Sequence, residues 1–376
     1  MARSRWIRCA LTTTIAIGTV ALAASLAGCT PSAGSPPVTQ APTTSRAPDV
    51  AAPTSRVALD CSELVSLGDL GRMFTDPMQA VNPAGPELAA GSGIPATYFV
   101  RSAGGVDCSW SNGKTNNGGA TIAAETATVT VLPDAAADWA KYRAKYHLRS
   151  DRDAFCSGDS STAACYLEAL VNGYWITADF ENVAAKVTGG TAPVPAVVRP
   201  VFAAAAAKLG RLPASTGTPS PATTPVGCDR YLTPGQAKSA IGTTATLEFG
   251  GTGDTWSVEA AALRRSGAPL CTLTPVGADQ GYGYVAILPD GAWGAADALS
   301  VTGAKSLSVG GLKPGDSATA YVSPTTNAIV VDLVVRGTWI EIDVVKLDAN
   351  AAIPAASVSP ATSAVRIARD IVRNLG

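Results

Sequence analysis

The sequence predicts an α+β protein made of two tandem copies of one domain, each an antiparallel β-sheet packed with helices on one face. Two observations support this prediction. Several motifs occur twice along the chain, in the same order and at nearly constant spacing. Within each copy, apolar runs of strand length alternate with segments that begin with helix-capping residues.

Five matched landmarks define the repeat. The separation between the second cysteine and the last tryptophan of each copy, Cys108 to Trp175 and Cys271 to Trp339, differs by a single residue. Such ordered agreement predicts a tandem duplication. The pairs are Cys61 with Cys228, Cys108 with Cys271, Val131-Leu132-Pro133-Asp134 with Ile287-Leu288-Pro289-Asp290, Asn172-Gly173-Tyr174-Trp175-Ile176 with Arg336-Gly337-Thr338-Trp339-Ile340, and Leu209-Gly210 with Leu375-Gly376.

The N-terminal segment predicts export. Arginines precede an apolar stretch, and the run Leu26-Ala27-Gly28-Cys29 resembles the bacterial lipobox. The resemblance implies that residues 1–28 are a signal peptide, removed before Cys29, and that Cys29 carries a diacylglycerol. The alternative is a signal anchor that stays in the membrane. We expect a lipid-anchored protein on the extracytoplasmic face of the cell membrane.

Two segments read as linkers because they are rich in Pro, Ser, Thr and Ala and poor in large apolar residues. Residues 29–58 are interpreted as a disordered tether and residues 213–226 as an interdomain linker. The two repeats then span 59–212 and 227–376. The formal net charge of −1 becomes more acidic once the signal is removed, which disfavours nucleic-acid binding.

The cysteines that remain after Cys9 and Cys29 are set aside form an even set of six. Outside the cytoplasm such a set predicts disulfides. The second repeat contains only two cysteines, so they are expected to pair with each other, and the repeat extends that pairing to the first copy. The predicted bridges are Cys61–Cys108, Cys156–Cys165 and Cys228–Cys271.

Each copy is expected to begin with a short capped helix. Thr233 is an N-cap, Pro234 takes the first helical position and Gln236 closes a capping box. Ser66 and Asp69 repeat the box in the first copy. Strand-like runs follow at 121–132 and 282–288.

A second helix is expected directly after each of these strands. Asp134 and Asp290 each follow a proline and are predicted to cap it. The runs 317–322, 328–335 and 338–345 are separated by turn residues and predict an antiparallel meander. Ser359-Pro360 then begins a C-terminal helix.

No arrangement of residues predicts catalysis, a metal site or a cofactor. His147 is the only histidine, and we expect it to be exposed. The glycine-rich run 250–253 lacks the Lys-Ser/Thr of a phosphate loop. Strand alternation predicts that the acidic side chains of the strands face solvent, which leaves a glycosidase-like pair of carboxylates as a minor alternative. These residues are Glu168, Asp179, Glu181, Glu341 and Asp343.

Two further features are candidates for binding. Four tryptophans, matched between the copies as Trp139 with Trp293 and Trp175 with Trp339, are expected either in the core or around an apolar ligand pocket. Lys141, Lys145 and Arg149 form a basic stripe at helical spacing, which reads either as a solvated face or as a contact for anionic lipid headgroups or an acidic partner.

The motifs together resemble uncharacterised secreted lipoproteins of mycobacteria and other actinobacteria. In these, a lipobox and a Pro/Ser/Thr linker precede small α+β domains, each opening Cys-x₄-Ser/Thr and carrying a second cysteine that is often followed by x-Trp. Cys61 with Ser66, Cys108-Ser109-Trp110 and Cys228 with Thr233 fit this pattern, whereas Cys271-Thr272-Leu273 lacks the tryptophan. The resemblance implies the fold and the compartment, and it transfers no site.

The function expected from the sequence is a non-catalytic binding module of the cell envelope, with an apolar or lipid-like ligand. The alternative is a protein-interaction adaptor or sensor accessory for a membrane complex, and an envelope hydrolase is third. The expected partners are the membrane, through the lipid anchor, and a lipid-like ligand or an envelope protein.

Overall fold

The structure is a computed structural model. It describes residues 50–82, 94–114, 124–148, 152–158, 163–184, 194–217, 227–248, 257–278, 280–323, 328–345 and 354–376. Within these ranges, no helix has both the length and the apolarity needed to cross a membrane.

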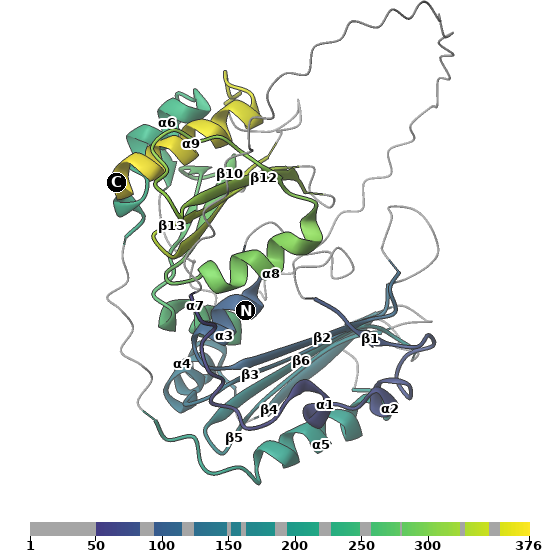
Figure 1. Ribbon diagram of the computed structural model, residues 1–376. Coiled ribbons are helices and arrows are strands. Elements are labelled where there is room, and N and C mark those ends of the chain that lie inside the picture. The colour runs from purple at the N-terminus through teal and green to yellow at the C-terminus, as the bar shows by residue number, and fades with distance from the viewer. Residues whose placement is uncertain are drawn as a thin grey trace, which may run out of the picture.

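The first domain contains a six-stranded antiparallel sheet of order β1-β2-β3-β6-β5-β4 (Figure 1). The strands come from neighbouring parts of the chain, with helices between them. The elements are α1 (Cys61–Leu64), α2 (Leu67–Leu70), β1 (Gln79–Ala80), α3 (Ala96–Ser102), β2 (Val106–Ser111), β3 (Thr126–Leu132), α4 (Ala136–Tyr146), β4 (Arg152–Gly158), β5 (Ala163–Val171), β6 (Tyr174–Val183) and α5 (Val198–Leu209).

The second domain contains a six-stranded antiparallel sheet of order β11-β12-β13-β14-β10-β8, with a separate β7-β9 pair. The elements are η2 (Cys228–Arg230), α6 (Pro234–Ile241), β7 (Leu247–Glu248), α7 (Val258–Arg265), β8 (Leu270–Thr272), β9 (Thr274–Pro275), β10 (Gly283–Leu288), α8 (Ala292–Thr302), β11 (Lys305–Ser306), β12 (Ser317–Val322), β13 (Ile329–Val335), β14 (Thr338–Val344) and α9 (Pro360–Leu375).

The two sheets share one strand order. Read from the edge that carries the second cysteine, β2-β3-β6-β5-β4 matches β8-β10-β14-β13-β12. The register agrees as well, because Leu132 lies opposite Trp175 in the first sheet and Leu288 lies opposite Trp339 in the second. The repeat seen in the sequence is therefore a repeat of structure, and the α+β class is confirmed.

The central hairpins of both sheets close in the same way. Asn172-Gly173 joins β5 to β6 and Arg336-Gly337 joins β13 to β14, and all four residues have positive φ. This is the conformation of a type I′ turn, whose twist matches that of antiparallel strands. The meander predicted in the second copy is present as β12, β13 and β14.

The predicted helix starts are confirmed at three places and wrong at two. Capping boxes begin α2 at Ser66 and α6 at Thr233, and Ser359 caps α9. The predicted caps Asp134 and Asp290 do not cap, because both take positive φ and the helices begin two residues later. The helices α4 and α8 are nevertheless where the sequence placed them.

Each sheet packs one face against helices of its own domain. In Figure 1, α5 lies on the outer side of the first sheet, and α6 and α9 lie on the outer side of the second. The buried face of α9 carries Ala364, Ile367, Ala368 and Ile371. These contacts form one apolar core in each domain.

A second helical layer covers the opposite faces of both sheets and joins the domains. Helices α3 and α7, which occupy equivalent places in the two copies, pack against each other between the sheets, and α8 lies between the domains (Figure 1). The third apolar core belongs to this junction and includes Trp139, Trp175 and Trp339. Helices therefore lie on both faces of each sheet, beyond the single helical face that the sequence predicted.

This second layer explains why the expectation for the strand carboxylates is wrong at three positions. Glu168, Glu341 and Asp343 are all at most 3% exposed, because their face of the sheet is covered by the junction. Asp179 is exposed and Glu181 is half-buried. Alternation along a strand indicates two faces, but it does not say which of them meets water.

The three predicted disulfides are confirmed, with Cα–Cα separations of 5.4 Å for Cys61–Cys108, 4.1 Å for Cys156–Cys165 and 5.7 Å for Cys228–Cys271. The first and third join the start of each domain to equivalent strands. Disulfides of this kind are typical of proteins from oxidising compartments, which indicates an extracytoplasmic protein.

Candidate functional site

A pocket of about 620 Å³ lies in the first domain, between the chain that precedes α1, helix α3 and strand β2. This volume is within the range of small-molecule sites. Its walls are mainly small or apolar. The lining residues are Pro53, Ser55, Val57, Ala58, Leu59, Asp60, Cys61, Glu63, Thr97, Arg101, Gly105, Val106 and Asp107.

Asp107 and Thr97 are the polar groups that face each other across α3 and β2. Asp107 is half-buried, and burial raises the pKa of its carboxyl to about 6, with Glu259 of α7 adding to the rise. Hydrogen bonds from Thr130 and the nearby Thr97 hydroxyl act in the opposite direction. The carboxylate is thus poised within the range of ordinary environmental pH.

Thr97 is 2% exposed, and its Oγ1 makes no hydrogen bond of normal geometry among the described residues. The Oγ1 atom is itself buried, so the hydroxyl does not open onto the pocket, and its effect is on the neighbouring Asp107 carboxylate.

The two other carboxylates of the pocket are committed to the fold. Asp60 accepts hydrogen bonds from Ser62 Oγ at 2.7 Å and Glu63 N at 2.8 Å, which lower the pKa of Asp60. Glu63 in turn accepts from Asp60 N at 2.8 Å. Together they form the capping box of α1. They supply negative charge at the pocket rim while holding its wall in shape.

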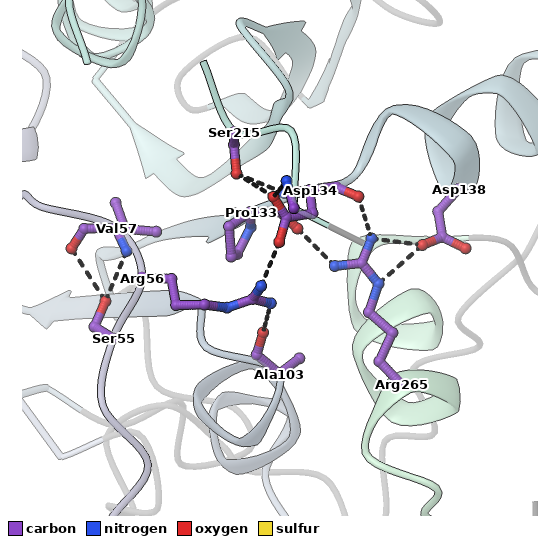
Figure 2. Close-up of polar contacts among 10 residues, drawn as sticks. Ser55, Arg56, Val57, Ala103, Pro133, Asp134, Asp138, Ser215 and Arg265 are labelled. Carbon is purple, nitrogen blue, oxygen red and sulfur yellow. Dashed lines mark hydrogen bonds and ion pairs between the residues drawn. The ribbon is translucent and has the colours of Figure 1, made fainter. Parts of the chain in front are cut away.

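The wall formed by residues 53–61 is fastened at both ends. At one end the Cys61–Cys108 disulfide joins it to β2. At the other, Arg56 forms an ion pair with Asp134 and donates to Ala103 O at 2.9 Å (Figure 2). Its own N–H donates to Gly104 O at 2.9 Å. The chain from 50 to 58, assigned to the tether from sequence, makes these ordered contacts with the first domain.

Asp134 connects this wall to the start of the linker. It is 7% exposed, and its Oδ1 accepts from Ser215 Oγ at 2.7 Å and from Gly217 N at 2.8 Å. Its N–H donates to Ser215 Oγ at 2.9 Å (Figure 2). The positive φ of Asp134, which prevents it from capping α4, turns its side chain to these partners.

Arg265 of α7 brings the second domain to the same place. It donates to the carbonyls of Pro133 at 2.6 Å and Asp134 at 2.9 Å, and through two nitrogens to Asp138 Oδ2 at 3.0 and 2.7 Å (Figure 2). Its side chain is only 8% exposed. We call Arg56, Asp134, Asp138, Ser215 and Arg265 the junction network.

The four predicted tryptophans lie at the domain junction and outside this pocket. Trp139 and Trp175 form an edge-to-face pair with ring centroids 5.2 Å apart, and Trp339 meets Tyr98 of the first domain at 5.0 Å. Trp293 is half-buried and carries the guanidinium of Arg101 at 4.7 Å from its centroid. Each of the other three is 1% exposed.

The match of Trp139 with Trp293 does not hold in position. Both helices begin two residues after their aspartate, so the place of Trp139 on α4 is taken on α8 by Ala295, which is also 1% exposed. Trp293 lies two residues earlier on its helix. Trp139 and Trp293 were matched because both follow a Leu-Pro-Asp motif closely, but they occupy different positions on their helices.

The basic stripe lies on the exposed side of α4, where Lys141 and Lys145 are exposed. Tyr146, 47% exposed, packs against Tyr142 in a tilted pair with ring centroids 4.9 Å apart, so an aromatic ring borders the lysines. His147, as predicted, is exposed and ends the helix in the left-handed conformation. Arg149 and the predicted lipidation site Cys29 lie outside the described residues.

The motifs of the sequence do not single out Asp107, Thr97, Arg56 or Arg265. Comparison of the repeats contains a signal for the first two. Counting from the second cysteine, Asp107 corresponds to Leu270 and Thr97 to Ala260, so the first copy is polar where the second is apolar. Asp107 pairs with Thr130 across the strands, as Leu270 pairs with Ala286. The fold does not require these polar groups.

Comparisons of the chain with protein-family models, with curated proteins and with solved structures find no match. The assignment of a function therefore rests on the geometry of this pocket and on the sequence.

Proposed function

We propose that the protein is a lipid-anchored, non-catalytic binding module of the cell envelope, and that its ligand occupies the pocket beside Asp107. The observation that carries the proposal is the half-buried carboxylate of Asp107 in a pocket of small-molecule size whose walls are mainly small or apolar. A site with apolar walls and a few convergent polar groups is typical of small-molecule binding.

The place of the pocket agrees with an anchored protein. Its wall begins at Pro53, a short stretch after the predicted lipidation site Cys29. Two acyl chains or more would hold such a protein on a membrane stably. The disulfides support the extracytoplasmic side as its location.

A substitution that fills the pocket tests the binding. Ala58 is exposed and lines the pocket, so Ala58→Trp adds bulk there without removing a core contact. The protein is purified from membranes in mild detergent and examined by native mass spectrometry. We expect a bound small molecule on the wild-type protein and its loss from Ala58→Trp. An adduct of the same mass on both proteins, or on neither, would contradict the proposal.

The anchor is tested separately by metabolic labelling with palmitate. Label on the wild-type protein and none on Cys29→Ala would support the predicted lipidation. Equal label on both proteins, or none on either, would count against it.

A further inference from the structure

Each sheet buries a carboxylate at the equivalent position of the face that meets the domain junction. Glu168 of β5 lies opposite Thr177 of β6, and Asp332 of β13 lies opposite Glu341 of β14. Glu168 and Asp332 are at most 2% exposed, and Glu341 is 3% exposed. The two copies therefore differ in one respect, because only the second places two buried carboxylates directly opposite each other.

This pairing brings the carboxyl groups of Asp332 and Glu341 together. Side chains directly opposite each other on antiparallel strands have Cβ atoms about 4.5–5.5 Å apart. Oδ1 of Asp332 accepts from Trp339 Nε1 at 2.6 Å, whereas its Oδ2 is buried and has no hydrogen-bond partner among the described residues. Two buried carboxylates this close resist ionising together, because their charges repel. A proton on Asp332 Oδ2 removes one charge and supplies a hydrogen-bond donor.

The surroundings favour this protonated form. Helix α8 packs against β13 and β14 and contains neither lysine nor arginine. Burial raises the pKa of Asp332 to about 7, although the hydrogen bond from Trp339 acts in the opposite direction. Burial also raises the pKa of Tyr321 on β12, and the charges of Glu341 and Asp332 add to that rise. The other titratable or charged groups on this face and on the helices around it are Asp343 of β14, Tyr284 of β10, Asp297 of α8, and Tyr98 and Arg101 of α3.

Asp332 is connected to the first domain through the indole of Trp339. This ring, whose N–H donates to Asp332, packs edge-to-face against Tyr98 of α3 with centroids 5.0 Å apart. The hydroxyl of Tyr98 in turn donates to Asp297 Oδ2 of α8 at 2.9 Å. Trp339 thus joins the protonation site to the contact between the domains.

We propose that Asp332 and Glu341 form a pH-sensitive latch, which closes the domain junction while they hold one proton and opens it when that proton is lost. On opening, the O–H bond of the Asp332 carboxyl breaks, its electron pair stays on the carboxylate and the proton passes to water. Trp339 and Tyr98 separate, and both anions gain the hydration that they lack beneath α8. The closed form is favoured below about pH 7 and loses its advantage as the pH rises through that value.

Hydrogen exchange of backbone amides measures this opening, because it detects open forms that are rarely populated. We expect protection factors in α3 and α8, corrected for the intrinsic pH dependence of exchange, to fall about tenfold between pH 6 and pH 8. Amides of α6 and α9, on the outer face of the second sheet, should be better protected at both pH values, since they exchange by global unfolding. Equal protection of the two sets would overturn the proposal, because the junction would then have no opening of its own.

Variants that hold a neutral group at the latch provide the comparison. Asp332→Asn keeps an N–H donor where the protonated carboxyl has its O–H, so protection in α3 and α8 should change less than about twofold between pH 6 and pH 8. Glu341→Gln removes the opposing charge and should reduce the change to less than about threefold, which keeps the test intact if Asp332→Asn does not fold. Asp290→Asn, an exposed carboxylate of the second domain, is the matched control and should retain the wild-type change. A change as large in both latch variants as in the wild-type protein would contradict the latch.

Discussion

Asp332 of β13 lies on the face of the second sheet that packs toward the first domain. It is 2% exposed, and its Oδ1 accepts a hydrogen bond of 2.6 Å from Trp339 Nε1. Its strand neighbours on this face are Thr319 and Glu341. Burial raises the pKa of Asp332 to about 7, because the ionised form loses its hydration inside the junction.

The raised pKa makes stability depend on pH. The folded protein holds this proton more tightly than the unfolded chain, so the contribution is complete below about pH 4 and is lost as the pH rises through about 7. Between pH 5 and pH 8 we expect Asp332 to reduce the free energy of unfolding by on the order of 2–3 kcal/mol. Urea unfolding at both pH values measures it. In Asp332→Asn this loss should largely disappear, and an unchanged loss would contradict the assignment.

Gly173 and Gly337 offer a matched comparison at the level of single residues. Both occupy the second position of a type I′ turn, with φ of 85° and 82°. A Cβ on Gly173 would lie 2.1 Å from Ser215 O, whereas one on Gly337 would have only Val50 Cγ2 at 3.7 Å. The residues differ in their contacts and not in their backbone.

Alanine at both positions therefore separates strain from contact. Gly337→Ala should cost about 1–2 kcal/mol of unfolding free energy, the ordinary penalty of a left-handed residue. Gly173→Ala should cost about 1–3 kcal/mol more, because it also displaces the segment that bonds to Asp134. Chemical denaturation of both variants measures the difference. Equal losses would show that the 211–217 segment does not press on this turn.

At the scale of elements, α4 carries the basic stripe for which the sequence suggests contact with anionic lipid headgroups. Lys141 and Lys145 lie one helical turn apart and are exposed, with the ring of Tyr146 beside them. Cations bordered by aromatic rings are favourable at the surface of an anionic membrane, at about 1 kcal/mol for each lysine.

Charge reversal tests this helix. We expect Lys141→Glu/Lys145→Glu to lower the partition coefficient onto phosphatidylglycerol-containing vesicles at least tenfold. Cosedimentation with vesicles measures it, using protein that lacks the predicted acyl anchor on Cys29. Arg366→Glu/Arg369→Glu, on the exposed side of α9, is the matched control. An equal loss of vesicle binding in both variants would show that binding depends on the net charge of the protein and not on the position of the lysines on α4.

The elements themselves were readily predicted where short-range chemistry defines them. Thr233 with Gln236, Ser66 with Asp69, and Ser359 with Pro360 begin helices in the sequence and in the structure, because a cap satisfies N–H groups only a few residues away. The prediction for Asp134 and Asp290 was wrong because aspartate is favoured both as a helix N-cap and as a left-handed turn residue, and the Pro-Asp sequence is the same in the two cases. Their φ values follow from the sharp turn between strand and helix.

At the scale of the whole molecule, the two domains pack like the subunits of a symmetric dimer. Helices α3 and α7 occupy equivalent places and pack against each other. Arg101 of α3 lies 3.9 Å from Asp297 of α8, and its equivalent Arg264 of α7 lies 3.7 Å from Asp138 of α4. Both ion pairs join equivalent helices, although Asp138 is the third residue of α4 and Asp297 the sixth of α8, so the packing of the two copies is symmetric in its elements and not in each contact. In this chain the interface is internal.

The apolar core that the two domains share at their junction predicts cooperative unfolding. We expect one calorimetric transition for both domains, with equal calorimetric and van't Hoff enthalpies. Arg265→Ala removes the hydrogen bonds to two carbonyls and the closer of the two guanidinium partners of Asp138, so it should cost about 3–5 kcal/mol and split the transition into two. Arg369→Ala, on the exposed side of α9, should change stability by less than about 0.5 kcal/mol. Two separate transitions in the wild-type protein would contradict this interpretation.

The sequence by itself determined the duplication, the α+β class and all three disulfides. Each depends on local spacing or on the matching of one copy to the other, and both can be read along the chain. It also placed the capped helices α2, α6 and α9 and the meander β12, β13 and β14, since caps, turns and alternating apolar residues act over a few positions, whereas the junction helices α3 and α7 were not predicted.

Only the tertiary structure decided which face of each sheet is buried and where the pocket lies. Glu168, Glu341 and Asp343 alternate as solvent-facing residues do, yet the helical layer at the domain junction buries them. The pocket brings Asp60, Thr97 and Asp107 together from separate elements, fastened by Arg56 to an aspartate far along the chain. Such contacts form between elements that are far apart along the chain, and no local sequence pattern shows which of these elements pack together.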